Sequence, residues 1–237
     1  MKLAVISDIH GNLHALDAVL EDIEGQGVDQ TIALGDFLSG PYDPAGVADR
    51  LMGLDLPSVR GNHDRFIVDG RDDDWEIDVL ARNALSAAQR EWLASMPATA
   101  KVGDVFLCHG TPASDMVLWL TGIDDDGKAF YRSQDSIERE ARGVDAEVLV
   151  CGHTHIARTL RLSDGRLVVN PGSVGMTLAI GSPAAHYAII EKRASGWRSS
   201  LIAVPYDHEA AAQQARGHGY PSWADAVRTG WALPWAL

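Results

Sequence analysis

Cysteine is scarce in this sequence, and long apolar runs are absent from it. The 237 residues include two cysteines, Cys108 and Cys151, which are too few for a disulfide scaffold. Each follows an apolar run, so we expect reduced thiols in the core. No apolar run approaches the roughly 18 residues of a membrane-spanning helix, and no basic leader precedes the first strand-like segment. We therefore expect a soluble, cytoplasmic protein that does not enter membranes.

Positive charge is also in short supply. Lys and Arg number 20 against 33 Asp and Glu, which gives a net charge of −13, and acidic runs stand at residues 72–74 and 124–126. Because such a surface repels phosphate backbones, general nucleic-acid binding is disfavoured. A small phosphorylated substrate attracted by bound metal ions remains compatible with this charge. The sequence does not predict the oligomeric state.

Hydrophobic patterning predicts an alternation of strands and helices. Short apolar runs at 2–6, 31–34, 57–59, 104–108 and 146–151 are typical of buried strands. Apolar residues at helical spacing between Leu13 and Ile23 predict an amphipathic helix ending near Gly25. The spacing also favours helices over 44–53, over most of 65–98 and over 134–142, and β pairs over 99–108, 158–169 and 187–204.

Two segments are harder to assign. Residues 111–131 fit no clear period, so we expect a loop or lid there. The tail after Asp207 is rich in Ala and then in Trp, and we expect a helix with an aromatic clasp formed by Trp223, Trp231 and Trp235. Since the sequence contains no repeat, low-complexity tract or linker, we predict a single α/β domain over residues 1–237.

Polar clusters follow five of the apolar runs. Strand-end loops of α/β sheets commonly collect ligand and catalytic groups. The clusters supply the nitrogen and oxygen donors that divalent first-row metals prefer. Eight such side chains at one edge would hold two metals, and a shared aspartate could bridge them. The eight residues are Asp8, His10, Asp36, Asn62, His63, His109, His153 and His155.

The order of these motifs resembles the calcineurin-like metallophosphoesterases. The matching blocks are Asp8-Ile9-His10, Gly35-Asp36, Gly61-Asn62-His63-Asp64, Cys108-His109-Gly110 and Gly152-His153-Thr154-His155. The run from Asn170 to Ser173 is similar to that of the small prokaryotic phosphodiesterases, which are related to diadenosine tetraphosphatase-type enzymes. The resemblance implies a four-layer αββα sandwich of two mixed β-sheets flanked by helices.

The resemblance also implies a role for each motif residue. Asp8, His10 and His155 would hold one divalent metal, Asn62, His109 and His153 would hold another, and Asp36 would bridge both. Manganese is the first expectation for these cofactors, with Fe, Zn, Co or Ni as alternatives. His63 would act on the substrate as general acid or charge stabiliser, and Asp64 would orient its ring.

Weaker candidates surround this set. Asn12, Tyr42, Arg60 and Asn170 are possible contacts to the substrate, although Asn12 could equally be the N-cap of the helix that follows it. Many relatives carry a further Asp shortly after Gly-Asp, whereas Phe37-Leu38-Ser39-Gly40-Pro41-Tyr42 stands here. This segment contributes to the entrance of the substrate site. The missing Asp therefore affects the expected identity of the substrate more than the expected metal binding.

These features predict a dinuclear metal-dependent phosphodiesterase. A metal-bound hydroxide would attack a small phosphorylated or nucleotide substrate while His63 protonates the departing oxygen. One alternative is a phosphomonoesterase or protein phosphatase with the same metal centre. Another is a non-catalytic interaction scaffold of the same fold, although such scaffolds tend to lose ligand side chains and none is lost here. A nuclease is disfavoured by the net charge of −13.

Overall fold

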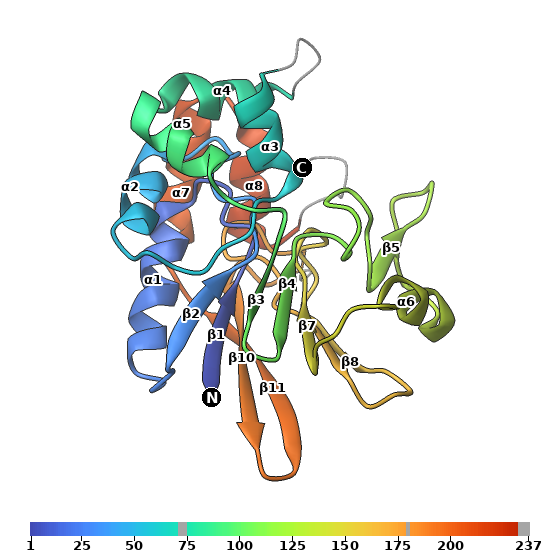
Figure 1. The fold of residues 1–237 in the computed structure, drawn as a ribbon. Coiled ribbons are helices and arrows are strands. Elements are labelled where there is room, and N and C mark those ends of the chain that lie inside the picture. The colour runs from blue at the N-terminus through green and yellow to red at the C-terminus, as the bar shows by residue number, and fades with distance from the viewer. Residues whose placement is uncertain (71–74, 179–180, 232–237) are drawn as a thin grey trace.

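Two mixed β-sheets lie face to face between helices in the computed structural model, which describes residues 1–70, 75–178 and 181–231 (Figure 1). The first sheet has the order β11-β10-β1-β2, in which β1 is parallel to β2 and antiparallel to β10. Its strands are β1 (Lys2–Ile6), β2 (Gln30–Ala33), β10 (Ala185–Arg193) and β11 (Gly196–Val204).

The second sheet has the order β3-β4-β7-β9-β8. Its three central strands run parallel to one another, and the two edge strands are antiparallel to their neighbours. These strands are β3 (Thr99–Val102), β4 (Val105–Cys108), β7 (Val148–Val150), β8 (Arg158–Arg161) and β9 (Leu167–Asn170). Because parallel strands end at the same edge, the loops after β4 and β7 emerge side by side.

Helices cover the outer face of each sheet, so the layers are helix, sheet, sheet and helix (Figure 1). The helix over the second sheet is α6 (Gln134–Glu140). The other helices are α1 (Leu13–Glu24), α2 (Pro44–Met52), α3 (Asn62–Asp69), α4 (Glu76–Ala84), α5 (Ala87–Ala94), α7 (His208–Gly217) and α8 (Pro221–Thr229). The predicted αββα sandwich of two mixed sheets is confirmed.

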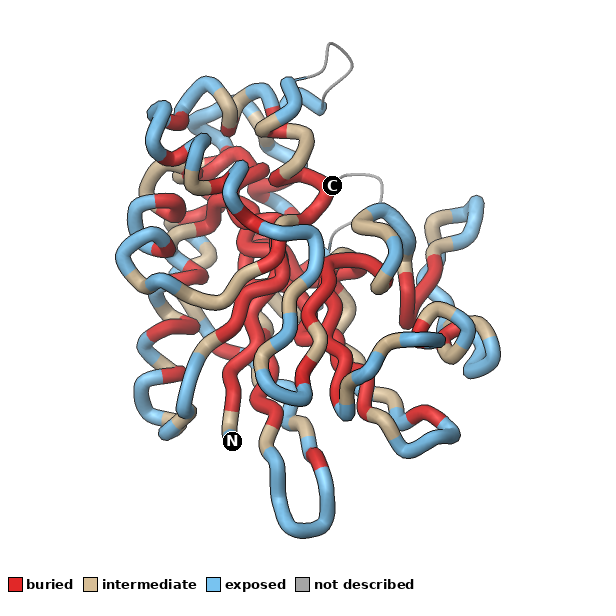
Figure 2. Tube along the Cα trace, in the orientation of Figure 1, coloured by how far each residue is buried: buried red, intermediate tan, exposed pale blue. Residues whose placement is uncertain are grey.

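Strand alternation explains this layering. In β1, Leu3 and Val5 belong to the apolar cluster between the sheets, whereas Ala4 and Ile6 belong to the cluster under the helices. Since successive side chains of a strand point to opposite faces, a wholly apolar strand fills two layers at once. The strand centres are buried and the hairpin tips are exposed (Figure 2).

Several helices begin directly after a polar residue whose side chain caps the helix. The side chain of Asn12 accepts a hydrogen bond from the backbone N of Ala15 and so caps α1. Asp43 caps α2 in the same way, directly before Pro44. Ser86 and Gln89 form a reciprocal capping box at the start of α5. Each cap satisfies backbone N–H groups that have no partner within the helix.

Three expectations need correction or refinement. The segment 57–59 is not a strand, because it contributes only an isolated bridge between Ala33 and Ser58. The segment 111–131 contains an antiparallel hairpin of β5 (Thr121–Ile123) and β6 (Ala129–Tyr131), so it is not all loop. The tail forms two helices where one was expected, and Trp223 of the predicted clasp packs into an apolar cluster with Tyr42 and Met176.

In that tail Trp223 is buried, but Trp231 is 65% exposed. Trp235 and the acidic run at 72–74 lie outside the described residues. Cys108 and Cys151 are buried free thiols, as expected. Among the residues with described structure, no helix is long and apolar enough to cross a membrane.

Candidate metal centre

The loops at one end of the two sheets bring the predicted ligands together. Asp8 and His10 follow β1, Asp36 follows β2, and Asn62 begins α3. From the second sheet, His109 follows β4, and His153 and His155 follow β7. Hydrogen bonds join the two sheets there, because the backbone N of His153 donates to the carboxylate of Asp8. The sheet edges therefore place all seven side chains in one region.

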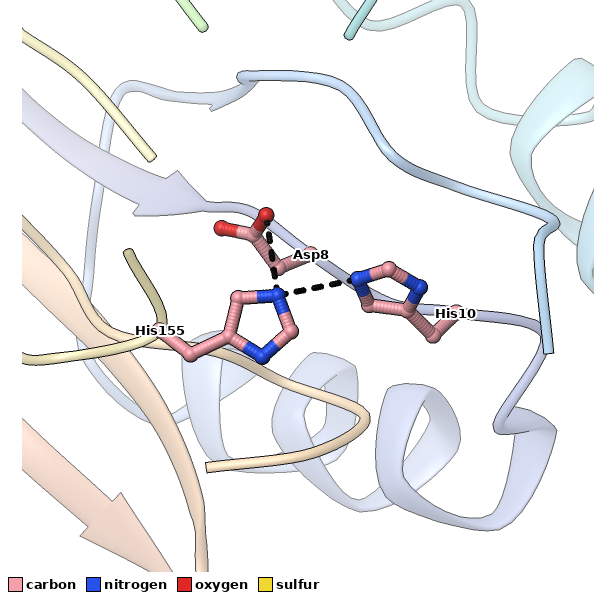
Figure 3. A group of neighbouring side chains, drawn as sticks. All are labelled: Asp8, His10 and His155. Atoms are coloured by element: carbon pink, nitrogen blue, oxygen red, sulfur yellow. Dashed lines mark hydrogen bonds and ion pairs between the residues drawn. The ribbon is translucent and has the colours of Figure 1, made fainter. Parts of the chain in front are cut away.

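The first group of donors consists of Asp8, His10 and His155 (Figure 3). Its ligand atoms all lie within 4.8 Å of one another. His155 Nε2 lies 3.5 Å from Asp8 Oδ1 and 3.0 Å from His10 Nε2. All three side chains are buried, so water cannot easily satisfy these atoms.

The second group consists of Asp36, His109 and His153, whose ligand atoms also lie within 4.8 Å of one another. His109 Nε2 lies 3.0 Å from Asp36 Oδ2 and 3.1 Å from Asn62 Oδ1. The two groups adjoin, because the same nitrogen is 4.0 Å from Asp8 Oδ1. The structure thus groups the donors as the motif pattern predicts.

Hydrogen bonds define the tautomers of the histidines. The Nδ1 atoms of His10, His109 and His155 face the carbonyl oxygens of Ser39, Leu34 and Met176 at 2.6, 2.7 and 2.7 Å. Since a carbonyl only accepts, each Nδ1 carries a proton, and the neutral ring presents a lone pair at Nε2. His153 is reversed, with Nε2 donating to Met116 O at 3.1 Å and the lone pair at Nδ1. This outer bonding is typical of metal-binding histidines.

The close pair of Nε2 atoms in the first group fits a bound cation. His10 Nε2 and His155 Nε2 are 3.0 Å apart although each ring already donates from Nδ1. Two lone pairs at this distance repel one another unless a cation or a proton lies between them. Burial and the neighbouring His155 lower the pKa of His10 to about 3, which disfavours the proton. The donor set therefore suits a divalent metal.

The second group has a different charge balance. Burial opposes protonation of His109, but the Asp36 carboxylate and its hydrogen bond raise the pKa of that ring to about 10. A metal ion bound here would replace this proton, because metal ligands bind in their deprotonated form. Burial and His109 lower the pKa of His153 to about 4, so that His153 is neutral and able to coordinate.

Five of the predicted ligands have left-handed backbone conformations. The φ angles are 56° for Asp8, 50° for His10, 53° for Asp36, 68° for His153 and 55° for His155. Non-glycine residues adopt this region rarely, and each instance costs of the order of 1 kcal/mol or more. Such residues cluster at functional sites, where the surrounding structure maintains them.

Two motif glycines permit the close approach of these loops. A Cβ on Gly61 would lie 2.1 Å from Asp36 Oδ1, and a Cβ on Gly152 would lie 1.9 Å from Ser7 Oγ. Neither contact is possible between real atoms, so any side chain at Gly61 or Gly152 would displace the neighbouring ligand loop. Glycine is required at these two positions because no Cβ fits there, and not because the backbone adopts a left-handed conformation.

His63 lies beside the metal groups and has its own partners. Its Nδ1 is 2.9 Å from Asp78 Oδ1 and 3.2 Å from Ser39 Oγ, and Asp78 is fully buried. Although burial opposes protonation, Asp36 and Asp78 raise the pKa of His63. The sequence did not reveal Asp78, because an acid in the first turn of a helix is favourable without any catalytic role.

Asp64 does not orient the His63 ring, which corrects the sequence-based expectation. Its Oδ2 accepts from the backbone N of Asp36 at 2.8 Å and of Gly61 at 2.9 Å, and its Oδ1 accepts from that of Phe37 at 3.0 Å. Burial and the nearby Asp36 carboxylate raise the pKa of Asp64 to about 7. Asp64 therefore braces the loop that carries Asp36.

Three of the four suggested substrate contacts have structural surroundings instead. Asn12 caps α1, and its Nδ2 donates to Gly175 O at 2.9 Å. Asn170 Nδ2 donates to Gly152 O at 2.6 Å and so supports the loop that carries His153. Tyr42 is buried against Trp223, with ring centroids 6.1 Å apart, and its hydroxyl has no partner among the described residues. Arg60 alone of the four lines a described cavity.

A cavity of about 340 Å³ opens above both metal groups. Its floor carries His63 and five of the seven candidate ligands, namely His10, Asp36, Asn62, His153 and His155. Its walls are largely apolar, and one of them holds Trp75, which is 50% exposed and lies edge-on to His63 with ring centroids 5.3 Å apart. The apolar lining residues are Phe66, Trp75, Met116, Leu118, Ile123 and Leu178.

The family of this chain follows from comparison with known proteins. A family model for the calcineurin-like phosphoesterase superfamily domain matches residues 1–195. The chain therefore belongs to the calcineurin-like phosphoesterase superfamily. It is a metal-dependent phosphoesterase with phosphodiesterase relatives.

Individual proteins resemble this chain at low identity or over only part of its length. The uncharacterised protein MJ0912 of Methanocaldococcus jannaschii is 26% identical over 245 residues, which cover 93% of this chain and 94% of MJ0912. Phosphodiesterase YfcE of Escherichia coli K12 is 43% identical over 74 residues, or 27% of this chain and 40% of YfcE.

Solved structures show the same fold. The crystal structure of a metallophosphoesterase from Sphaerobacter thermophilus has 27% identity and a TM-score of 0.78, covering 98% of this chain and 99% of the other. A second structure, provisionally assigned as a diadenosine tetraphosphatase, has 20% identity and a TM-score of 0.55 over 86% of this chain and 93% of its own. At that identity it supports the fold alone.

Proposed function

We propose that the protein is a phosphodiesterase that uses two divalent cations to hydrolyse a small phosphorylated or nucleotide substrate. The observation that carries this proposal is the buried pair of His10 Nε2 and His155 Nε2, which face one another at 3.0 Å although each ring already donates from Nδ1. A purely structural cluster would instead pair donors with acceptors. YfcE, to which part of the chain is similar, is itself named as a phosphodiesterase.

The residues divide into two metal-binding sets. Asp8, His10 and His155 would hold one cation, and Asn62, His109 and His153 would hold the other. Asp36 would be shared, since it contacts His109 of the second set and lines the same cavity as His10 and His155 of the first set. When bound, divalent cations at such a site activate water and neutralise charge on the phosphoryl oxygens. Imidazole and carboxylate donors suit manganese, which we propose as the native metal, and also Fe, Zn, Co and Ni.

His63 would protonate the departing oxygen. Asp78 Oδ1 accepts a hydrogen bond from Nδ1 and so fixes the ring, whose other nitrogen then carries the transferable proton. Asp36 and Asp78 raise the pKa of His63 against the effect of burial, which favours the protonated ring near neutral pH. A general acid placed in this way typically contributes about 10²–10⁴-fold to the rate.

The cavity walls favour a substrate with a planar apolar part. Trp75 and Phe66 present aromatic rings beside His63, and the remaining wall residues are aliphatic or Met. Nucleobases stack on exposed aromatic rings with little dependence on sequence. The volume of about 340 Å³ matches a small-molecule site, and nothing in it resembles a groove for a long polymer. A nucleotide ester is therefore our proposed substrate class.

The test is a metal analysis followed by a substrate screen. We expect up to two equivalents of transition metal per chain, and Mn²⁺-dependent hydrolysis of bis-p-nitrophenyl phosphate in preference to p-nitrophenyl phosphate. The screen then extends to dinucleoside polyphosphates, cyclic nucleotides and phosphopeptides. Preference for the monoester or for phosphopeptides would favour a phosphatase with the same centre. A protein that binds no metal and hydrolyses none of these esters would overturn the proposal.

A further inference from the structure

A second cavity, of about 240 Å³, is lined by His109, which is not among the residues that line the proposed substrate cavity. Its walls come from the end of the 57–60 segment, the start of β3, α3 and the loop after β4. His109 is the one metal-binding candidate in its lining. The polar residues that carry the argument below are Arg60, Arg65, Thr99, His109, Ser114 and Asp115.

The two arginines of this cavity differ in their partners. Arg65 forms a bidentate pair with Asp115, with Nε to Oδ2 at 2.7 Å and Nη2 to Oδ1 at 3.0 Å. Arg60 has no ion pair within the described part of the chain, and its buried Nε has no hydrogen-bond acceptor there. Asp115 is fully engaged by Arg65, so the cavity retains one uncompensated positive charge.

A buried guanidinium nitrogen without an acceptor distinguishes Arg60 from the other arginines in the described part of the chain. The chain carries a net charge of −13, with 33 acidic residues available to pair with 20 basic ones. Arg60 is nevertheless held in place, because its backbone N donates to Pro97 O at 2.9 Å and the preceding Val59 is buried. Leaving a buried N–H of a guanidinium without an acceptor is costly. An anion in the cavity that accepts from the guanidinium of Arg60 would offset the charge and part of that cost.

Hydroxyl groups complete an anion-binding lining. Ser114 Oγ accepts from the backbone N of Met116 at 3.1 Å, which leaves its proton free to donate. Thr99 is exposed at the start of β3 and lines the same cavity. A guanidinium flanked by hydroxyl donors matches the oxygens of a phosphate, which accept two parallel hydrogen bonds from arginine.

We propose that this cavity binds a phosphate group through Arg60. The phosphate has two candidate sources, namely a second phosphate of the ester that reacts at the metal centre, or free inorganic phosphate. The first source rests on the proposed phosphodiesterase function, whereas the anion site itself does not. Proximity favours the first source, because His109 lines this cavity while its Nε2 lies 3.0 Å from Asp36 Oδ2.

Binding is tested by crystallography with tungstate, a heavy analogue of phosphate, soaked into wild-type, Arg60→Gln, Arg60→Lys and Arg198→Gln proteins. Arg198 is the matched control, since its side chain is 65% exposed on β11 and lies outside this cavity. We expect anomalous density within hydrogen-bond distance of Arg60 in the wild type, Arg60→Lys and the control, and none there in Arg60→Gln. No density at Arg60 in the wild type would overturn the proposal.

Kinetics distinguish the two sources. If the phosphate belongs to the substrate, Arg60→Gln raises KM for diadenosine tetraphosphate by about tenfold or more and leaves KM for bis-p-nitrophenyl phosphate, which has one phosphate, unchanged. If the phosphate is free, both KM values stay constant and Arg60→Gln weakens inhibition by inorganic phosphate. Unchanged KM values together with unchanged inhibition would contradict the site.

Two further readouts keep these outcomes separable. Melting temperatures of all variants establish that each is folded, and Arg60→Lys retains the charge if Arg60→Gln does not fold. If the wild type hydrolyses no ester but tungstate still binds at Arg60, the phosphodiesterase proposal fails and the anion site stands. If hydrolysis occurs and Arg60 binds no tungstate, the phosphodiesterase proposal stands and the anion site fails.

Discussion

Asp78 and His63 form a buried pair in which Asp78 Oδ1 lies 2.9 Å from His63 Nδ1. The pair joins the first turn of α4 to the first turn of α3, so the imidazole is positioned by a residue outside every motif that marks the site. The second carboxylate oxygen of Asp78 is buried and has no partner among the described residues. A buried carboxylate with one unsatisfied oxygen is costly, and its retention is consistent with a positioning role.

The first prediction concerns Asp78→Asn. We expect a fall in kcat of about 10-fold or more for nucleoside esters, whose leaving groups need protonation. The neutral amide would no longer favour the protonated His63 ring as the Asp78 carboxylate does. Esters of p-nitrophenol should be affected little, since that leaving group departs without a proton. Metal content should stay constant. Glu76→Gln, in the same helical turn but exposed, is the control. An equal loss for both leaving groups would argue against positioning of a general acid.

A second prediction distinguishes the metal-binding role of Asp36 from the general-acid role of His63. Asp36→Ala should lose bound metal and activity together, because Asp36 is the ligand that we assign to both cations. His63→Ala should retain its metal and lose about 10²–10⁴-fold in kcat. Elemental analysis of the purified variants alongside steady-state rates measures both quantities. If the two variants lose metal to the same extent, the division of roles between Asp36 and His63 is wrong.

The third prediction tests the aromatic wall. Trp75→Ala should raise KM for the p-nitrophenyl ester of thymidine 5′-monophosphate by about 5- to 100-fold, corresponding to a stacking energy of about 1–3 kcal/mol per base. Methyl p-nitrophenyl phosphate has the same leaving group and no base, so its KM should be nearly constant. Trp75→Phe should restore most of the affinity. Trp231→Ala, which removes an exposed Trp outside the cavity, is the control. Equal shifts for both esters would exclude base stacking.

The fourth prediction concerns metal removal. Chelator-treated protein should melt at a lower temperature than protein with added Mn²⁺, because a ligand that binds only the folded state stabilises it. At a metal concentration of 100 times Kd the gain is about 2.7 kcal/mol per site. For a chain of this size, that energy corresponds to a rise of about 5–10 °C in Tm. Asp36→Ala should show little response, and a wild-type Tm that is insensitive to Mn²⁺ would contradict the two-metal assignment.

The fifth prediction concerns Gly61. An added Cβ would lie 2.1 Å from Asp36 Oδ1 and 2.7 Å from Asp36 N, so Gly61→Ala must displace the Asp36 loop. We expect a loss of about 1–3 kcal/mol in the free energy of unfolding and weaker metal binding. Gly53→Ala is the control, since φ there is −71° and the nearest contact to the new Cβ is an ordinary 3.6 Å. Denaturant unfolding and metal titration would measure the difference.

Much of the metal centre could be predicted from the sequence because its donors follow strands directly. A short apolar run places the next polar residues at a sheet edge, and parallel strands deliver those residues to the same edge. Asp8, Asp36 and His109 are examples, and their grouping in the structure matches the motif order. The αββα layering could be predicted for the same reason, since wholly apolar strands need cover on both faces.

The remaining features depend on packing that sequence does not encode locally. Asp78 meets His63 only because α3 and α4 lie against one another, and nothing in its own surroundings distinguishes it from an ordinary helix-start acid. Asp64 was assigned to the adjacent His63 because the two are neighbours in sequence. In the helix its carboxylate turns back toward the unpaired N–H groups at the start of α3 and of the Asp36 loop. The hairpin of β5 and β6 escaped prediction because each strand has only three residues.

The left-handed backbone at five ligand positions has a consequence for stability. Glycine adopts such φ values without strain, and asparagine at lower cost than most residues. Replacing His10 or His153 by either would relax the empty fold while removing a metal donor. The ligand positions therefore lower the stability of the metal-free fold, and bound cations would more than restore it. A variant without these donors would keep the sandwich, lose the chemistry and no longer depend on metal ions for its stability.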